Sequence, residues 1–187
     1  MVKRLILLMG LAFLNLSLAA GILVGRVNGS DALIALVANG NELLAYVCGG
    51  PADWQTHTSW FKGDLSANGS FSLNTDNLWL NGTILGQAAR GVLELADGSR
   101  LSWQALSPQK DSPAGLYRMA DSEAVTGFIV NNELESVGSI RLIKPNAQAL
   151  VLPVFLKGSL PAETITGVDV CYSNEGQESC LFTPRFE

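Results

Sequence analysis

Asn-Gly and Asp-Gly pairs recur between short apolar runs, and this pattern constrains the fold more than any other feature of the chain. Glycine tolerates the positive φ that tight hairpin turns require, and Asn or Asp tolerates it better than most residues. The pairs stand at Asn28-Gly29, Asn39-Gly40, Asn68-Gly69 and Asp97-Gly98. No segment after residue 20 keeps a helical period over three turns. The pattern therefore predicts an antiparallel all-β meander of about ten to twelve short strands, connected mostly in sequence order.

A second pattern lies inside the expected strands, where a glycine has an apolar residue two positions away on each side. It occurs at Leu23–Val27, Phe61–Leu65, Leu80–Ile84, Ala89–Leu93, Val125–Ile129 and Leu156–Leu160. Glycine weakens a strand interior, so its repetition indicates sharp bends or the close approach of a ring or another backbone. Repeated bends favour a closed or nearly closed β-barrel, with a two-sheet β-sandwich as the alternative. By this pattern Asn81-Gly82 lies within a strand, although the same pair elsewhere predicts a turn.

The first twenty residues have the pattern of a secretory signal peptide. Lys3 and Arg4 precede an apolar run from Leu5 to Leu18, which is too short to span a bilayer comfortably. We therefore expect an exported protein, periplasmic or extracellular, whose mature chain of residues 21–187 forms one all-β domain. Residues 145–187 are expected to add strands to that same domain, because so short a segment has too small a core to fold alone.

The mature chain is acidic, with ten Lys and Arg residues against seventeen Asp and Glu residues once the leader is removed, a net charge of −7. This charge opposes docking on nucleic-acid phosphates or anionic lipid, and the basic residues are scattered singly. We expect no nucleic-acid partner. The apolar run from Ala149 to Leu156 is too short for a membrane span, so no transmembrane segment is expected in the mature chain.

The three cysteines divide into a pair and a single residue. Cys171 and Cys180 flank a polar stretch that is typical of a hairpin loop, and in an oxidising compartment they are natural disulfide partners. Cys48 ends an apolar run and is expected to be a small buried hydrophobe. A nucleophilic role for Cys48 would need a neighbouring base, and the chain has a single histidine, His57.

The loop from Gly49 to Ser59 is the most site-like stretch of the sequence. His57 could act as a general base oriented by Asp53, with Ser59 as the nucleophile, which would make the protein a hydrolase. Spacing does not supply the geometry of a triad, however, and the chain has no Gly-x-Ser-x-Gly elbow. We therefore expect His57 to be a solvated loop histidine.

The four tryptophans also divide by context. Trp79 and Trp103 stand in alternating, strand-like runs and are expected to point into the core, whereas Trp54 lies in the loop and is the better candidate for ligand contact. A zinc site lacks enough nitrogen and sulfur ligands, and Asn74–Asn77 lacks the glycine and glutamate of a calcium loop. We expect neither a metal nor a cofactor.

Three segments resemble those of a family of secreted bacterial β-rich proteins. They are Ala45-Tyr46-Val47-Cys48, Trp60-Phe61-Lys62-Gly63 and Ala114-Gly115-Leu116-Tyr117-Arg118, the last preceding a glycine-containing strand at Thr126-Gly127-Phe128. The likeness covers Gly25 to about Val130. That family carries no assigned activity, so the resemblance implies secretion and adds no chemistry.

These observations predict an exported, non-enzymatic β-barrel protein that binds a small ligand at one end. The ligand-facing candidates are Trp54, His57, Trp60, Tyr117 and Arg118. The alternative is an envelope structural or interaction protein whose strand edges or C-terminal hairpin meet another envelope protein. The third hypothesis is a hydrolase built around His57.

Overall fold

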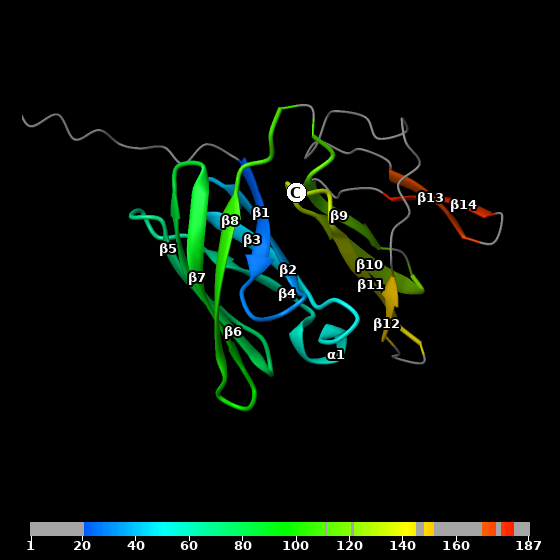
Figure 1. Cartoon of the computed structure of the whole chain (residues 1–187), viewed down its shortest axis with the longest axis horizontal. Helices are drawn as coiled ribbons and strands as arrows, with labels where there is room; N and C mark the ends of the chain where they lie inside the picture. The colour runs from blue at the N-terminus through cyan, green and yellow to red at the C-terminus, as the bar shows by residue number, and fades with distance from the viewer. Residues whose placement is uncertain are drawn as a thin grey trace, which may run out of the picture.

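The computed structural model describes residues 21–110, 112–120, 122–144, 148–151, 170–174 and 177–181, with backbone alone for residues 119, 120, 151, 170–174 and 177–181. The predicted signal peptide and the glycine pattern at residues 156–160 lie outside this part. Within it the protein is all-β, apart from one short helix in the loop before the fourth strand (Figure 1).

The first eight strands form one antiparallel sheet that curls into a nearly closed barrel (Figure 1). They are β1 (Gly21–Val27), β2 (Leu33–Asn39), β3 (Glu42–Cys48), β4 (Ser59–Asp64), β5 (Ser70–Asn74), β6 (Leu78–Leu85), β7 (Ala88–Leu95) and β8 (Arg100–Leu106). Their order in the sheet is β4-β3-β2-β1-β8-β7-β6-β5, so β1 pairs with β8 and the sheet edges are β4 and β5. The predicted meander and its barrel shape are confirmed.

Local sequence accounts for the turns of the barrel. Gly29, Gly40, Gly69 and Gly98 all have positive φ, between 61° and 83°, as the four predicted turns require. Asn81-Gly82 lies inside β6, which confirms that this pair is not a turn. A Cβ at Gly82 would lie 2.5 Å from Cζ2 of Trp103, so this glycine makes room for a ring in the barrel interior.

Alternating side chains fill the barrel interior with apolar residues. Its largest fully buried members are Trp103, Phe61, Ile34, Leu36, Leu43, Leu80 and Leu93. Trp103 faces inward as predicted, but the prediction for Trp79 is wrong, because Trp79 is 40% exposed. Side chains alternate along a strand, and in β6 the inward positions belong to Leu78 and Leu80 on either side of Trp79.

A second antiparallel sheet packs against the outside of the barrel (Figure 1). It contains β9 (Gly115–Ala120), β10 (Ala124–Val130), β11 (Ser136–Leu142) and β12 (Gln148–Val151), in the order β12-β11-β10-β9. Leu116, Ile129 and Val137 lie in one buried apolar cluster with β1–β3 residues such as Val24 and Ala35. These strands therefore cover one face of the barrel instead of extending its wall.

The remaining described strands form a hairpin of β13 (Val170–Asn174) and β14 (Gln177–Leu181). Its register sets Cys171 directly opposite Cys180. Opposite residues of an antiparallel pair have Cα atoms about 4.5–5.5 Å apart, within the range that a disulfide spans. The backbone pairing is therefore compatible with the predicted disulfide.

The loop between β3 and β4 folds back over the barrel end and contains α1 (Trp54–His57). The carboxylate of Asp31 accepts hydrogen bonds from the N–H groups of Gly50, at 3.0 Å, and Ala52, at 2.9 Å. These bonds hold the start of the loop in place. In the part of the chain that the structure describes, no helix is long and apolar enough to cross a membrane.

Candidate functional site

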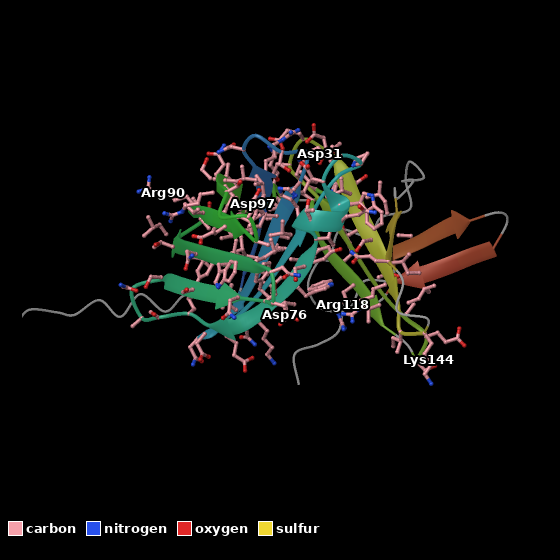
Figure 2. All side chains as sticks on the ribbon, turned by 90° about the horizontal axis from the view of Figure 1, so that it is seen from below. Asp31, Asp76, Arg90, Asp97, Arg118 and Lys144 are labelled. Carbon is pink, nitrogen blue, oxygen red and sulfur yellow. The ribbon has the colours of Figure 1, made fainter. Side chains whose placement is uncertain are left out.

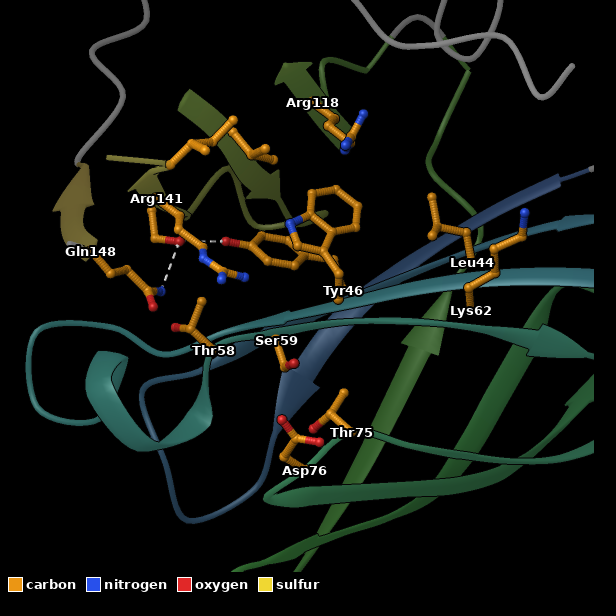
Figure 3. A pocket seen from close by; sticks show the side chains of 14 residues that line it. Leu44, Tyr46, Thr58, Ser59, Lys62, Thr75, Asp76, Arg118, Arg141 and Gln148 are labelled. Carbon is orange, nitrogen blue, oxygen red and sulfur yellow. Dashed lines mark hydrogen bonds between the residues drawn. The ribbon is translucent and has the colours of Figure 1, made fainter. Parts of the chain in front are cut away.

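A groove of about 930 Å³ lies between the outer face of β3–β4 and the second sheet (Figure 3). It is lined by Leu44, Tyr46, Thr58, Ser59, Trp60, Lys62, Thr75, Asp76, Arg118, Val125, Ser139, Arg141, Ile143 and Gln148. Most of these side chains are polar or charged, in contrast to the apolar cluster where the two sheets touch. The groove therefore begins where the apolar contact between the sheets ends.

Strand register explains why these residues face the groove. On the barrel side, Leu44 pairs with Lys62 and Tyr46 pairs with Trp60, so all four lie on the outer face of β3–β4. On the second sheet, Arg118, Gly127 and Ser139 form one row across three strands. A neighbouring row brings Val125, Arg141 and Gln148 to the same face.

A stacked aromatic pair forms the centre of the barrel wall of the groove. The rings of Tyr46 and Trp60 are 4.1 Å apart between centroids and 20° from parallel. Gly127 lies against them, since a Cβ there would be 2.5 Å from Cζ2 of Trp60 and 3.1 Å from the Tyr46 ring. The absence of a side chain at this position allows the second sheet to approach the two rings.

A hydrogen-bond network anchors the aromatic pair to the second sheet. The hydroxyl of Tyr46 lies 2.9 Å from Oγ of Ser139, and Nε2 of Gln148 donates to that oxygen at 3.2 Å (Figure 3). Burial raises the pKa of Tyr46 well above its ordinary value, so its hydroxyl stays protonated at neutral pH. The rings are thus fixed from both sides of the groove.

Three cationic side chains, Lys62, Arg118 and Arg141, reach the groove from β4, β9 and β11. The guanidinium carbon of Arg118 lies over the ring of Trp60, 5.6 Å from its centroid, in a cation–π contact. One acidic residue, Asp76, is among the lining residues, and Figure 3 shows it with Thr75 at the end away from Arg118. The walls of the groove therefore carry a local excess of positive charge.

A second cavity of about 610 Å³ adjoins this end of the groove and shares Thr58, Ser59, Thr75 and Asp76 with it. His57 lines this cavity, and its side chain is only 8% exposed. The expectation of a solvated histidine is therefore wrong, because α1 packs against β3 and carries the ring inward.

The surroundings of His57 do not have the geometry of a triad. Nδ1 of His57 lies 2.8 Å from Oγ1 of Thr56 and 4.0 Å from the carboxylate of Asp53, the latter too long for a hydrogen bond. That carboxylate instead accepts from the hydroxyl of Ser30 at 2.7 Å, which lowers the pKa of Asp53. No serine or cysteine is among the described hydrogen-bond partners of the ring.

Cys48 is fully buried at the end of β3, which confirms its interpretation as a small buried hydrophobe. Burial raises the pKa of its thiol to about 11. The thiol therefore stays protonated at neutral pH and is a poor nucleophile. Among the described residues, no group of three or more His, Cys, Asp and Glu side chains could hold a metal ion.

The structure brings two of the five sequence candidates together. Trp60 and Arg118 are in contact across the groove, whereas His57 lines the adjoining cavity. Trp54 is half-buried in α1 and lines neither space. Tyr117 lies on the other face of β9, where it is buried against Phe128 with ring centroids 4.6 Å apart.

Sequence reasoning missed Tyr46, Lys62 and Gln148 as lining residues. A signal for the first two was present. Tyr46 stands two residues after Leu44 in β3, and Lys62 stands two residues after Trp60 in β4, so each shares a strand face with that neighbour. Nothing local marks Gln148, which reaches the groove through the pairing of β11 with β12.

Comparisons of the chain with family models, with curated proteins and with solved structures find no match. The resemblance to secreted bacterial β-rich proteins therefore stays a prediction.

Proposed function

We propose that this protein is an exported, non-enzymatic β-barrel protein that binds a small ligand in the groove between the barrel and the second sheet. The observation that carries this proposal is the Tyr46–Trp60 pair, held in place by Gly127 and Ser139 at the centre of a groove of about 930 Å³. Pockets of this size with a few convergent polar groups are the usual form of small-molecule sites.

Export is proposed from the sequence of residues 1–20 and the C-terminal cysteine pair. A positively charged start and a short apolar run are typical of a secretory leader, and an exported chain would meet an oxidising compartment. A ligand-binding role in the periplasm or outside the cell fits this placement.

Two alternatives have weaker support. A hydrolase centred on His57 would need a nucleophile near the ring, and the described partners of His57 include no serine or cysteine. An envelope interaction protein would need an exposed docking surface. Leu85 and Leu106 are both more than half exposed and flank Ala88 in register on β6–β8, but such a pair is common on the surface of a monomer.

The first experiment compares native and denaturing mass spectra of the mature protein, purified from its own host's envelope or culture medium. A bound mass that is lost on denaturation supports the ligand-binding proposal and identifies the ligand. A defined multimer or hetero-complex without a small bound mass supports the interaction protein instead. A bare monomer contradicts both.

A tryptophan variant then tests whether the groove is the site. Trp60→Ala should weaken binding of the identified ligand about tenfold or more, since a buried aromatic contact contributes roughly 1–3 kcal/mol. Trp79→Ala is the matched control, because Trp79 is exposed on β6 and lines neither cavity. Equal affinities of the two variants, with folding intact by circular dichroism, would place the ligand elsewhere.

A further inference from the structure

The positive charge of the groove is unusual for so acidic a chain. The whole sequence has a net charge of −5, yet the described lining of the groove carries Lys62, Arg118 and Arg141 against one acid, Asp76. Lys62 comes from the barrel, whereas the two arginines come from the second sheet. Folding therefore concentrates positive charge at a place where the overall composition would disfavour it.

Two of these cations have no counterion in the part of the chain that the structure describes. Among the described residues, neither Lys62 nor Arg118 forms an ion pair, whereas Arg26 pairs with Glu135 and Arg100 with Glu94. The opposite charge would have to come from a bound anion, which the positive field of the groove would attract. An anion entering the groove would therefore meet two cations, Lys62 and Arg118, that have no carboxylate partner among the described residues.

The guanidinium of Arg118 is held in position by its contact with Trp60. A stacked guanidinium is pre-organised, so less side-chain entropy is lost when its N–H groups bind a ligand. Its fork of donors matches the paired oxygens of a carboxylate or phosphate group. Lys62, from the facing β4, adds a second charge with rotatable donors.

Apolar groups line the groove beside the cations. Leu44 is the register partner of Lys62 on β3, while Val125 and Ile143 contribute from the second sheet side. A ligand that uses this wall would combine its charged group with a ring or a hydrocarbon chain. Asp76 lies at the end of the groove away from Arg118 (Figure 3), so its carboxylate would repel an anionic group placed at that end.

We infer that the ligand is a small organic oxyanion, with its carboxylate or phosphate group bound by Arg118 and Lys62 and its apolar body against Leu44 and Trp60. This inference rests on the proposed function, because it specifies the chemistry of a ligand in the same groove.

Two fluorescent probes that differ in charge test the inference on the mature full-length protein. Anilinonaphthalene sulfonate carries an oxyanion, and phenylnaphthylamine has the same rings without it. The protein should bind the sulfonate about tenfold more tightly, and this preference should shrink as salt is raised. Equal affinity for the two probes overturns the inference.

Charge-removing variants assign the preference to residues. Arg118→Gln should reduce the ratio of sulfonate affinity to phenylnaphthylamine affinity from about tenfold to nearly one. Lys62→Gln repeats the test at an exposed position where misfolding is not expected. Arg90→Gln is the matched control, since Arg90 is exposed on β7, on the far side of the barrel from Arg118 (Figure 2). A sulfonate preference that persists in both groove variants overturns the assignment.

The outcomes separate this inference from the proposed function. If both probes bind equally and both are lost in Trp60→Ala, the groove is a ligand site but not an anion site. If Trp60→Ala changes the affinity of neither probe, the proposed function fails as well.

Benzoate and phenyl phosphate, tested as competitors of the sulfonate, distinguish a carboxylate site from a phosphate site. The stronger competitor identifies the group that the site prefers, and no competition by either contradicts the inference.

Discussion

At the residue scale, burial rather than residue type determines the chemistry of this protein's reactive groups. Cys48 and Tyr46 both have raised pKa values, mainly because their side chains are removed from water. Each stays neutral and acts as a packing group. Arg118, by contrast, is only half-buried and lines the groove.

The raised pKa of Cys48 predicts a loss of stability in alkaline solution. The ordinary thiol pKa is 9.0, and burial raises it to about 11 in the folded protein. Below the pKa of the thiol in the unfolded chain, the folded and unfolded states both carry the neutral thiol, so the stability that its burial contributes is fully present. As the pH rises toward the folded pKa, the unfolded chain alone ionises, and the free energy of unfolding falls by up to about 2–3 kcal/mol.

Urea unfolding across this pH range, on the wild type and on Cys48→Ala, measures this effect. The alanine variant should lose the part of the decline that begins near the ordinary thiol pKa. An identical decline in both proteins would assign it to another group, such as Tyr46. Native Cys48 should also resist alkylation by iodoacetamide at neutral pH, because a buried protonated thiol is unreactive.

At the element scale, each strand divides its residues between two environments. In β3, Leu43 and Ala45 pack inside the barrel, while Leu44 and Tyr46 face the second sheet and the groove. The inner face of the second sheet is divided along its length, with Leu116 in the apolar contact and Arg118 in the groove. A shift of register by one residue in β3 or β9 would exchange these faces and remove the site.

The β13–β14 hairpin predicts a cross-strand disulfide. Its register pairs Cys171 with Cys180, and closing a loop of this size contributes roughly 2–3 kcal/mol to stability in the chain-entropy model. A peptide map of the exported protein without reductant should contain a fragment linking the two cysteines.

The double variant Cys171→Ser/Cys180→Ser should unfold at lower urea concentration than the oxidised wild type. It should match the reduced wild type, because both lack the cross-link. Free thiols at both positions in protein purified from an oxidising compartment would contradict the prediction.

At the scale of the whole molecule, one buried cluster joins the barrel to the second sheet. Ile129 of β10 is fully buried against the cluster that includes β1 and β2 residues. The two sheets should therefore unfold together, since neither can expose this surface without cost.

Ile129→Ala tests this coupling. We expect a loss of about 2–4 kcal/mol in the free energy of unfolding, from lost burial and the resulting cavity. Hydrogen exchange, followed by mass spectrometry, should show lower protection in peptides from the barrel as well as from β9–β11. The control Leu85→Ala, at a side chain that is 58% exposed, should change little. Lower protection confined to β9–β11 would show that the two sheets unfold independently.

Much of the fold could be predicted because its signals are local. The positive φ of Gly29 and Gly98 depends on turn residues that stand next to each other in the chain. The position of Trp79 could not be read in the same way, because alternating residues define two faces without showing which one is inside. Trp60 and Arg118 were both candidates, but their contact was not predictable.

The sequence by itself determined the all-β class, the four glycine turns and the strand position of Asn81-Gly82, because these follow from backbone preferences of neighbouring residues. Only the tertiary structure decided that β9–β12 form a separate sheet and that a groove opens beside it. The groove depends on contacts such as Trp60 with Gly127, and on cations brought together from β4, β9 and β11. Such contacts arise from the packing of distant strands, which no local pattern of residues records.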